Sequence, residues 1–277
     1  INNCGDIKLY AANDMFDEIE NCARIITREI RENNRSFSDF AVLAGDIENY
    51  RGIIESVFKK YDISYFDDRR TEIKSKPLIL YILTLLKSAA YRIDADNLLM
   101  LFKTGLTGAD SEDICLLENY IEMWDLKERH FTSKDEWFYN PLEIKPELSD
   151  EGKKILLKLN NLKKEYIIPV IDFIKEIKNS SGEKTVEKLY DFLISQKIPK
   201  KLDKRTAAFR KRNDESSAAE EEQLWNVFIK ALEQLHIALG NREYSALRFY
   251  EFFILALSCY IIGKIPVSLD EVLTGTV

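Results

Sequence analysis

The densest group of chemically useful side chains lies between Lys197 and Arg212, where eight lysines and arginines surround one aspartate. Ammonium and guanidinium groups neutralise phosphates, so the segment favours contact with a nucleic-acid backbone, and Phe209 is available to stack on a base. The alternative is a solvated linker paired with the acidic run 220–222. The candidate contacts are Lys200, Lys201, Lys204, Arg205, Arg210, Lys211 and Arg212.

Two shorter groups offer the same chemistry. Lys103 and Thr104, followed by Gly105, can present an ammonium, a hydroxyl and main-chain N–H groups to a phosphate. The competing interpretation is a helix C-terminus with glycine in a left-handed cap. Arg69 and Arg70 follow a predicted strand at its carboxyl end, where open α/β sheets bind ligands, although salt-bridged surface residues would fit equally.

No pattern indicates catalysis, a cofactor or a metal. The four cysteines form no C-x-x-C pair, and the two histidines, His130 and His236, lie too far apart for a local metal motif. Glu118 and Glu122 are one helical turn apart but lack a neighbouring histidine or second acidic cluster. We therefore assign no catalytic, cofactor-binding or metal-binding residue from the sequence.

Composition indicates a helix-rich globular protein. The 277 residues are 45% hydrophobic and 31% charged, with 10 Gly and 6 Pro, which excludes collagen-like, disordered and disulfide-scaffold classes. A net charge of −7 excludes a uniformly basic surface but not a local basic patch. The longest apolar stretch, 252–262, is too short for a membrane span, so we expect no membrane partner. The four scattered cysteines favour reduced thiols, so we expect a cytoplasmic protein. The chain begins with Ile1 rather than Met, as expected of a piece of a longer polypeptide.

The first part of the chain has a β-α-β-α-β pattern. Strands are predicted at 7–10, 40–44 and 63–66, with helices starting after Asp14 and Asp46. The continuous apolar run 40–44 is typical of a strand buried on both faces, so we expect a parallel sheet with helices on both sides. No glycine-rich phosphate loop is present, so a complete nucleotide cradle is missing.

The middle of the chain has helical periodicity throughout. Helices are predicted at 77–91, 95–103, 110–124, 149–178 with a kink at Pro169, 182–196, 215–240 and 242–262. The stretch 125–148 is predicted as a loop anchored by its aromatic residues, and 272–277 as the start of another strand. The sequence thus predicts an α/β domain at 1–76, a helical insertion domain at 77–264, and a return to the α/β domain at 265–277.

Three sets of motifs carry a resemblance to a known family. They are Phe40-Ala41-Val42-Leu43 with Tyr61-Asp62-Ile63-Ser64-Tyr65-Phe66, Lys103-Thr104-Gly105-Leu106 with Leu117-Glu118-Asn119-Tyr120, and Gly263-Lys264-Ile265-Pro266 with Leu269-Asp270-Glu271-Val272. From about Ile7 onward the chain resembles the AddB family, the B subunits of bacterial AddAB ATP-dependent helicase–deoxyribonucleases, which have a UvrD-like superfamily 1 helicase fold.

The resemblance implies a fold of class α/β plus all-α, in which the partial parallel sheet of a second RecA-like domain is interrupted by a large helical insertion. It implies DNA and an AddA-type helicase–nuclease subunit as partners in a heterodimer. It further implies that the parent enzyme is a hydrolase acting on double-strand breaks in recombinational repair, whose ATP, Mg²⁺ and iron–sulfur cluster would lie outside these residues.

One departure from active superfamily 1 helicases implies a non-catalytic role. Such helicases carry an arginine that reaches the γ-phosphate shortly after this strand, where the present chain has Ala44 and Gly45. Two alternatives remain open. One is a helical protein-interaction module that binds the partner helicase subunit without touching DNA. The other is an independent nucleotide-dependent hydrolase, against which the missing phosphate loop and arginine count.

Overall fold

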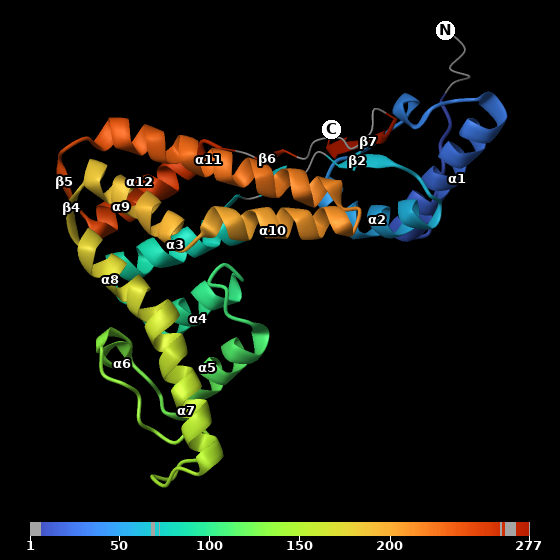
Figure 1. The fold of residues 1–277 in the computed structure, drawn as a ribbon. Helices are drawn as coiled ribbons and strands as arrows, with labels where there is room; N and C mark the ends of the chain where they lie inside the picture. Colours follow the sequence, from blue (N-terminus) through green and yellow to red (C-terminus); the bar gives the residue numbers. More distant parts are fainter. Residues whose placement is uncertain (1–6, 68–69, 72, 261, 264–269, 277) are drawn as a thin grey trace. The chain divides into compact units, whose positions relative to one another are not determined.

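The computed structural model describes residues 7–67, 70–71, 73–260, 262–263 and 270–276, and most of them are helical (Figure 1). The chain divides into two units, one formed by residues 1–70 and 263–277 and the other by residues 71–262. The motif that begins at Gly263 and the boundary predicted at 264–265 lie largely outside the described residues.

The first unit is built on a parallel sheet of strand order β1-β7-β2. The last strand in sequence, β7, lies between the other two, with Leu273 opposite Ala41 and Val272 opposite Tyr65. The strand predicted at 272–277 is therefore confirmed. The elements are α1 (Met15–Asn33), η1 (Phe37–Asp39), β1 (Ala41–Ala44), η2 (Ile47–Tyr50), α2 (Arg51–Lys60), β2 (Tyr65–Asp67) and β7 (Val272–Thr276).

The helical segments after Asp14 and Asp46 begin where the sequence predicts. The Asp14 carboxylate accepts a hydrogen bond from the Asp17 N–H at 2.8 Å, and Asp46 does the same for Glu48 at 3.1 Å, which satisfies main-chain donors at each start. The apolar sides of α1 and α2 pack with buried Val272 in one core. This core holds the sheet in place from one side.

Two predictions for this unit are wrong. Residues 7–10 form no strand, because a four-residue alternation gains little without a neighbouring strand, and Leu9 is 98% exposed. The sheet is not covered on both faces by the described residues: Val272 is buried, whereas Leu43 and Leu273 are more than half exposed. An apolar run therefore does not distinguish a strand covered on two faces from one covered on a single face.

The second unit is a helical assembly around one large core. Long helices α10 and α11 lie side by side and run in opposite directions (Figure 1). Its elements are η3 (Ile73–Ser75), α3 (Pro77–Ala90), α4 (Ala95–Lys103), α5 (Ser111–Met123), α6 (Glu128–Thr132), α7 (Asp150–Leu162), the π-helical η4 (Lys163–Ile167), α8 (Ile168–Ile177), β4 (Asn179–Ser181), α9 (Gly182–Ser195), α10 (Ile198–Lys211), α11 (Glu215–Leu239), β5 (Glu243–Ser245) and α12 (Ala246–Ser258). Strands β4 and β5 of this unit pair antiparallel. The short strands β3 (Arg70–Thr71) and β6 (Ile262–Gly263) lie at the unit boundaries in the sequence and form a separate two-stranded sheet.

Most of the predicted helices are present. The helix predicted at 149–178 with a kink at Pro169 contains a π-helical turn just before that proline, because proline has no N–H to donate and its ring displaces the carbonyl four residues earlier. The loop predicted at 125–148 contains the short helix α6. The helix predicted at 242–262 begins only at Ala246, after β5, where the Ser245 hydroxyl accepts from the Arg248 N–H at 3.3 Å.

Candidate functional site

The basic segment 197–212 is a helix, α10, rather than a linker. Pro199 lies in its first turn, where the missing N–H costs nothing, and Ala207 and Ala208 favour helix in its second half. Ile198, Leu202 and Thr206 are buried against the rest of the unit. Packing of this side fixes the direction in which each of the charged side chains leaves the helix.

Three lysines lie on the outer side of α10. Lys204 follows Lys200 by four residues and Lys211 follows Lys204 by seven, so successive turns bring them into one row about 16 Å long. All three are exposed, and none has a carboxylate partner among the described residues. This row, here called the α10 lysine row, is a set of positive charges without salt bridges among the described residues, on a packed helix.

Lys201 points to the opposite side of α10 and links this helix to the turn that follows the Lys103-Thr104-Gly105 motif. Its ammonium donates to the main-chain carbonyls of Leu106 and Thr107 at 2.8 and 2.6 Å, directly after the Lys103-Thr104-Gly105 motif. Burial lowers the pKa of the Lys201 ammonium, with Lys197 adding repulsion. Lys201 therefore holds the 106–107 turn against α10.

The arginines of α10 are paired with α11. Arg205 donates to the buried Glu221 carboxylate at 3.0 Å, and Arg210 contacts Glu222 at 2.7 Å and Glu215 at 3.6 Å. The pairing between the basic and acidic runs that the sequence suggested is thus present. Arg212, the residue after the helix, is exposed.

The Lys103-Thr104-Gly105 motif ends α4. Gly105 has a φ of 75°, which is the left-handed conformation expected of a glycine after a helix. The Thr104 hydroxyl is buried and donates to the Leu101 carbonyl at 2.7 Å. The Lys103 ammonium is paired with Glu118, which holds the pKa of Lys103 above its ordinary value. Arg69 lies outside the described residues, and Arg70 belongs to β3.

The aromatic residues of the 133–148 segment mainly anchor it. Trp137 is buried and donates its indole N–H to the His130 carbonyl at 3.0 Å, and the ring of Tyr139 stacks on Trp124 with centroids 4.6 Å apart. Phe138 is 70% exposed. The sequence predicts that these rings anchor the segment, and Trp137 and Tyr139 do so whereas Phe138 does not.

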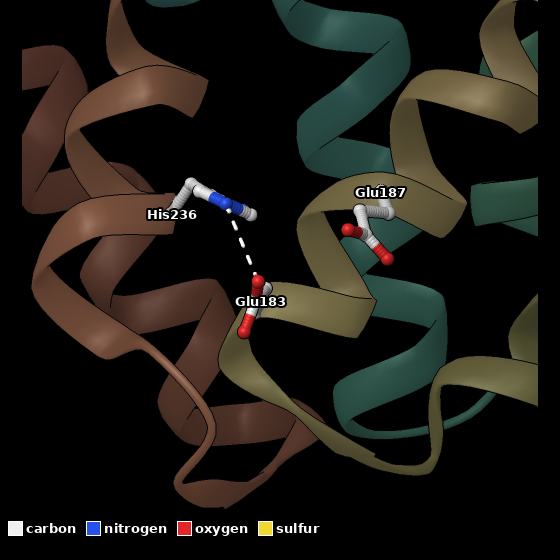
Figure 2. Close-up of side chains that lie close together, drawn as sticks. All are labelled: Glu183, Glu187 and His236. Carbon is white, nitrogen blue, oxygen red and sulfur yellow. Dashed lines mark ion pairs between the residues drawn. The ribbon is translucent and has the colours of Figure 1, made fainter.

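A cluster that the sequence did not reveal lies between α9 and α11 (Figure 2). Glu183 and Glu187 are one turn apart on α9, and the His236 ring of α11 lies 3.5 Å from the Glu183 carboxylate, measured from Nε2 to Oε1. One donor atom from each of the three residues lies within 4.8 Å of the others. The four-residue spacing of the glutamates is visible in the sequence, but the histidine comes from a distant part of the chain.

With this geometry established, comparison with known proteins shows what the chain is similar to. The chain is 33% identical to the B subunit of the ATP-dependent helicase/deoxyribonuclease of Clostridium botulinum (strain Loch Maree / Type A3), over all of the chain and 24% of that protein. It is 28% identical to the protein of that name from Clostridium acetobutylicum and 31% identical to that from Acetivibrio thermocellus, in each case over 98% of the chain and 24% of the relative. The chain is homologous to a segment of this B subunit. No family model matches it.

The resemblance inferred from the sequence motifs is thereby confirmed, and it extends over practically the whole chain. The chain spans about a quarter of the length of the curated helicase/deoxyribonuclease B subunits it matches. Among the described residues, no helix is both long and apolar enough to cross a membrane.

Proposed function

We propose that this chain is a non-catalytic, helicase-like segment of an ATP-dependent helicase–deoxyribonuclease subunit that processes DNA double-strand breaks for recombinational repair. In this role it contacts the DNA backbone through the α10 lysine row and an AddA-type partner subunit through other surfaces. The observation that carries the DNA contact is the alignment of Lys200, Lys204 and Lys211 on one exposed side of a packed helix. The relatives are named as helicase/deoxyribonuclease subunits, which supports DNA as the ligand.

The geometry favours backbone contact over base reading. Lysine ammonium groups act as point charges that suit phosphate oxygens, and a straight row of them follows a strand without selecting a sequence. The ion pairs of Arg205 and Arg210 with α11 keep those guanidinium groups engaged within the protein. We therefore assign the leading role to the lysine row, with exposed Arg212 at its end.

The proposal extends to the fold and to ATP. A parallel sheet with β7 inserted between β1 and β2 fits part of a RecA-like domain, and the exposed Leu43 and Leu273 offer an apolar face to further elements of such a domain. Ala44 and Gly45, at the carboxyl end of β1, provide no cationic group for a γ-phosphate. We expect no ATP hydrolysis by the 277-residue chain above a protein-free control, and measurable turnover would instead favour the independent hydrolase.

The salt dependence of binding to a fluorescein-labelled oligo-dT strand tests the DNA contact. Each phosphate contact on a single strand contributes about −0.7 to the slope of log affinity against log salt. Replacing Lys200, Lys204 and Lys211 together by Gln should therefore make the slope shallower by up to about 2 and weaken binding at low salt.

The matched control replaces three exposed helical lysines elsewhere, Lys175, Lys184 and Lys230, by Gln, with the same change in net charge. This variant should bind as the parent chain does. Equal losses of DNA affinity in both variants would mean that only the net charge of the chain matters, and would reject the α10 lysine row as the DNA contact. No binding by the parent chain at low salt would favour the protein-interaction module that does not touch DNA.

A further inference from the structure

Main-chain hydrogen bonds fix α9 and α11, the two helices that carry Glu183, Glu187 and His236, relative to each other. The Gly182 N–H donates to the Arg242 carbonyl at 2.8 Å, and the Glu183 N–H donates to the Gly240 carbonyl at 2.9 Å. These bonds tie the first turn of α9 to the chain that leaves α11, and the β4–β5 pairing continues the connection. The backbone positions of the three side chains are therefore set by the fold.

The cluster is negatively charged and accessible. The Glu183 carboxylate lies beside the His236 ring, and no lysine or arginine among the described residues pairs with Glu187. The nearby Lys188 ammonium is engaged by the Glu176 carbonyl and the Ser180 hydroxyl. Two carboxylates therefore face one imidazole with no fixed cation between them.

A groove of about 540 Å³ opens beside the cluster, and Glu187 and His236 are part of its wall. Its floor is largely apolar, with Trp225 and Ile229 of α11 among its lining residues. Glu233, one turn before Ile237 on α11, lines the same groove but is not among the three clustered donors. A bound ion would thus keep one side open to water or to an incoming ligand.

We propose that Glu183, Glu187 and His236 form a binding site for a divalent transition-metal cation of the Zn²⁺ type. Two carboxylate oxygens and an imidazole nitrogen suit Zn²⁺ and its first-row neighbours, whereas Mg²⁺ prefers an all-oxygen shell. Metal–ligand bonds of about 2.0–2.2 Å place two donors of one ion no more than about 4 Å apart. The Glu183–His236 pair meets that limit at 3.5 Å, and the exposed Glu187 side chain can rotate to close the third contact.

The small number of histidines makes the test direct. The chain contains two, and the Nδ1 atom of His130 accepts a hydrogen bond from the Lys127 N–H at 2.9 Å, which makes His130 an internal reference. In a chelator-treated, ¹⁵N-histidine-labelled chain, one equivalent of Zn²⁺ should shift the side-chain resonances of His236 and leave those of His130 in place. Equal amounts of Mg²⁺ should shift neither. The absence of a Zn²⁺-dependent change at His236 would overturn the proposal.

Calorimetric titration with Zn²⁺ then tests the carboxylates. His236→Gln and Glu187→Gln should each weaken Zn²⁺ binding at least about tenfold, because each removes a ligand. The matched control is Glu233→Gln, which removes the same charge from the same groove and should change affinity less than about threefold. Circular dichroism melts of all three variants report folding, and Glu187→Gln alters an exposed position. Equal weakening by Glu187→Gln and Glu233→Gln would mean a diffuse electrostatic effect and would reject the site.

Discussion

A Cβ atom placed on Gly182 would lie 2.3 Å from the Cβ atom of Leu239. The first turn of α9 and the last turn of α11 are therefore in contact at a distance that only glycine permits. The hydrogen bonds from Gly182 and Glu183 to the chain after α11 depend on this close approach. Gly182 is thus a packing residue at the junction that supports the Glu183–His236 pair.

Gly182→Ala should destabilise the helical unit. The added methyl group must push α9 away from Leu239, and overpacking of this kind costs about 1–3 kcal/mol. The measurement is the free energy of unfolding from urea titration. The matched control is Gly152→Ala in α7, where the nearest atoms to an added Cβ lie 3.4 Å away. Alanine also has a higher helix propensity than glycine, so the stability of this variant should stay within about 1 kcal/mol of that of the parent chain. Equal effects of the two substitutions would contradict the close approach.

Lys201 and Lys204 should separate a structural role from a surface role on the same helix. Lys201→Met leaves the Leu106 and Thr107 carbonyls without their donor, and an unsatisfied buried polar group costs about 1–3 kcal/mol. Lys204→Met removes an exposed charge and should change stability by less than about 0.5 kcal/mol. Urea titrations of the two variants measure the difference, and equal stabilities would contradict the structural role of Lys201.

The same pair should behave in the opposite way toward DNA. Lys204→Met should make the salt dependence of oligo-dT binding shallower by about 0.7, as expected for one lost phosphate contact. Lys201→Met should leave that slope unchanged under conditions where the variant is folded. A shallower slope with Lys201→Met and not with Lys204→Met would mean that DNA binds the Lys201 side of α10, which would contradict the α10 lysine row.

Asn160 should be the main attachment point of the 133–148 segment. Its side chain accepts from the Trp137 N–H at 2.7 Å and donates to the Trp137 carbonyl at 2.9 Å. Asn160→Ala removes both bonds and should cost about 1–3 kcal/mol of stability, together with faster cleavage of this segment by a protease. The neighbouring exposed Asn161→Ala should match the parent chain in both measurements. Similar cleavage rates for the two variants would show that other contacts hold the segment.

The sequence is most informative where one physical signal dominates. Asp14 and Asp46 are predicted as helix caps because a side-chain acceptor before an amphipathic run satisfies main-chain donors, and both carboxylates do so. The Gly105 cap follows from the tolerance of glycine for positive φ. These features depend on a few adjacent residues, so they require no tertiary information.

Features that depend on residues far apart in the sequence are not predicted from the sequence alone. The sequence does not separate helix α10 from a linker because its charges are numerous, and Ile198, Leu202 and Thr206 become its buried side only when α11 is in place. The pairing of β4 with β5 joins segments too short to show periodicity. The approach of His236 to Glu183 depends on that same junction, so spacing along the chain does not reveal it.

The buried tyrosines Tyr81 and Tyr120 should make stability fall in alkaline solution. Burial raises the pKa of Tyr120 to about 12 and also raises the pKa of Tyr81, whereas tyrosine in an unfolded chain has a pKa of about 10. Above about pH 10 the unfolded chain therefore binds fewer protons than the folded one, and the stability present at lower pH is lost progressively as the pH rises toward about 12. Urea titrations at successive pH values and phenolate absorbance near 295 nm measure the two effects. Tyr120→Phe should reduce the loss per pH unit, whereas Tyr91→Phe at an exposed position should leave it unchanged; an unaltered pH dependence in Tyr120→Phe would contradict the burial argument.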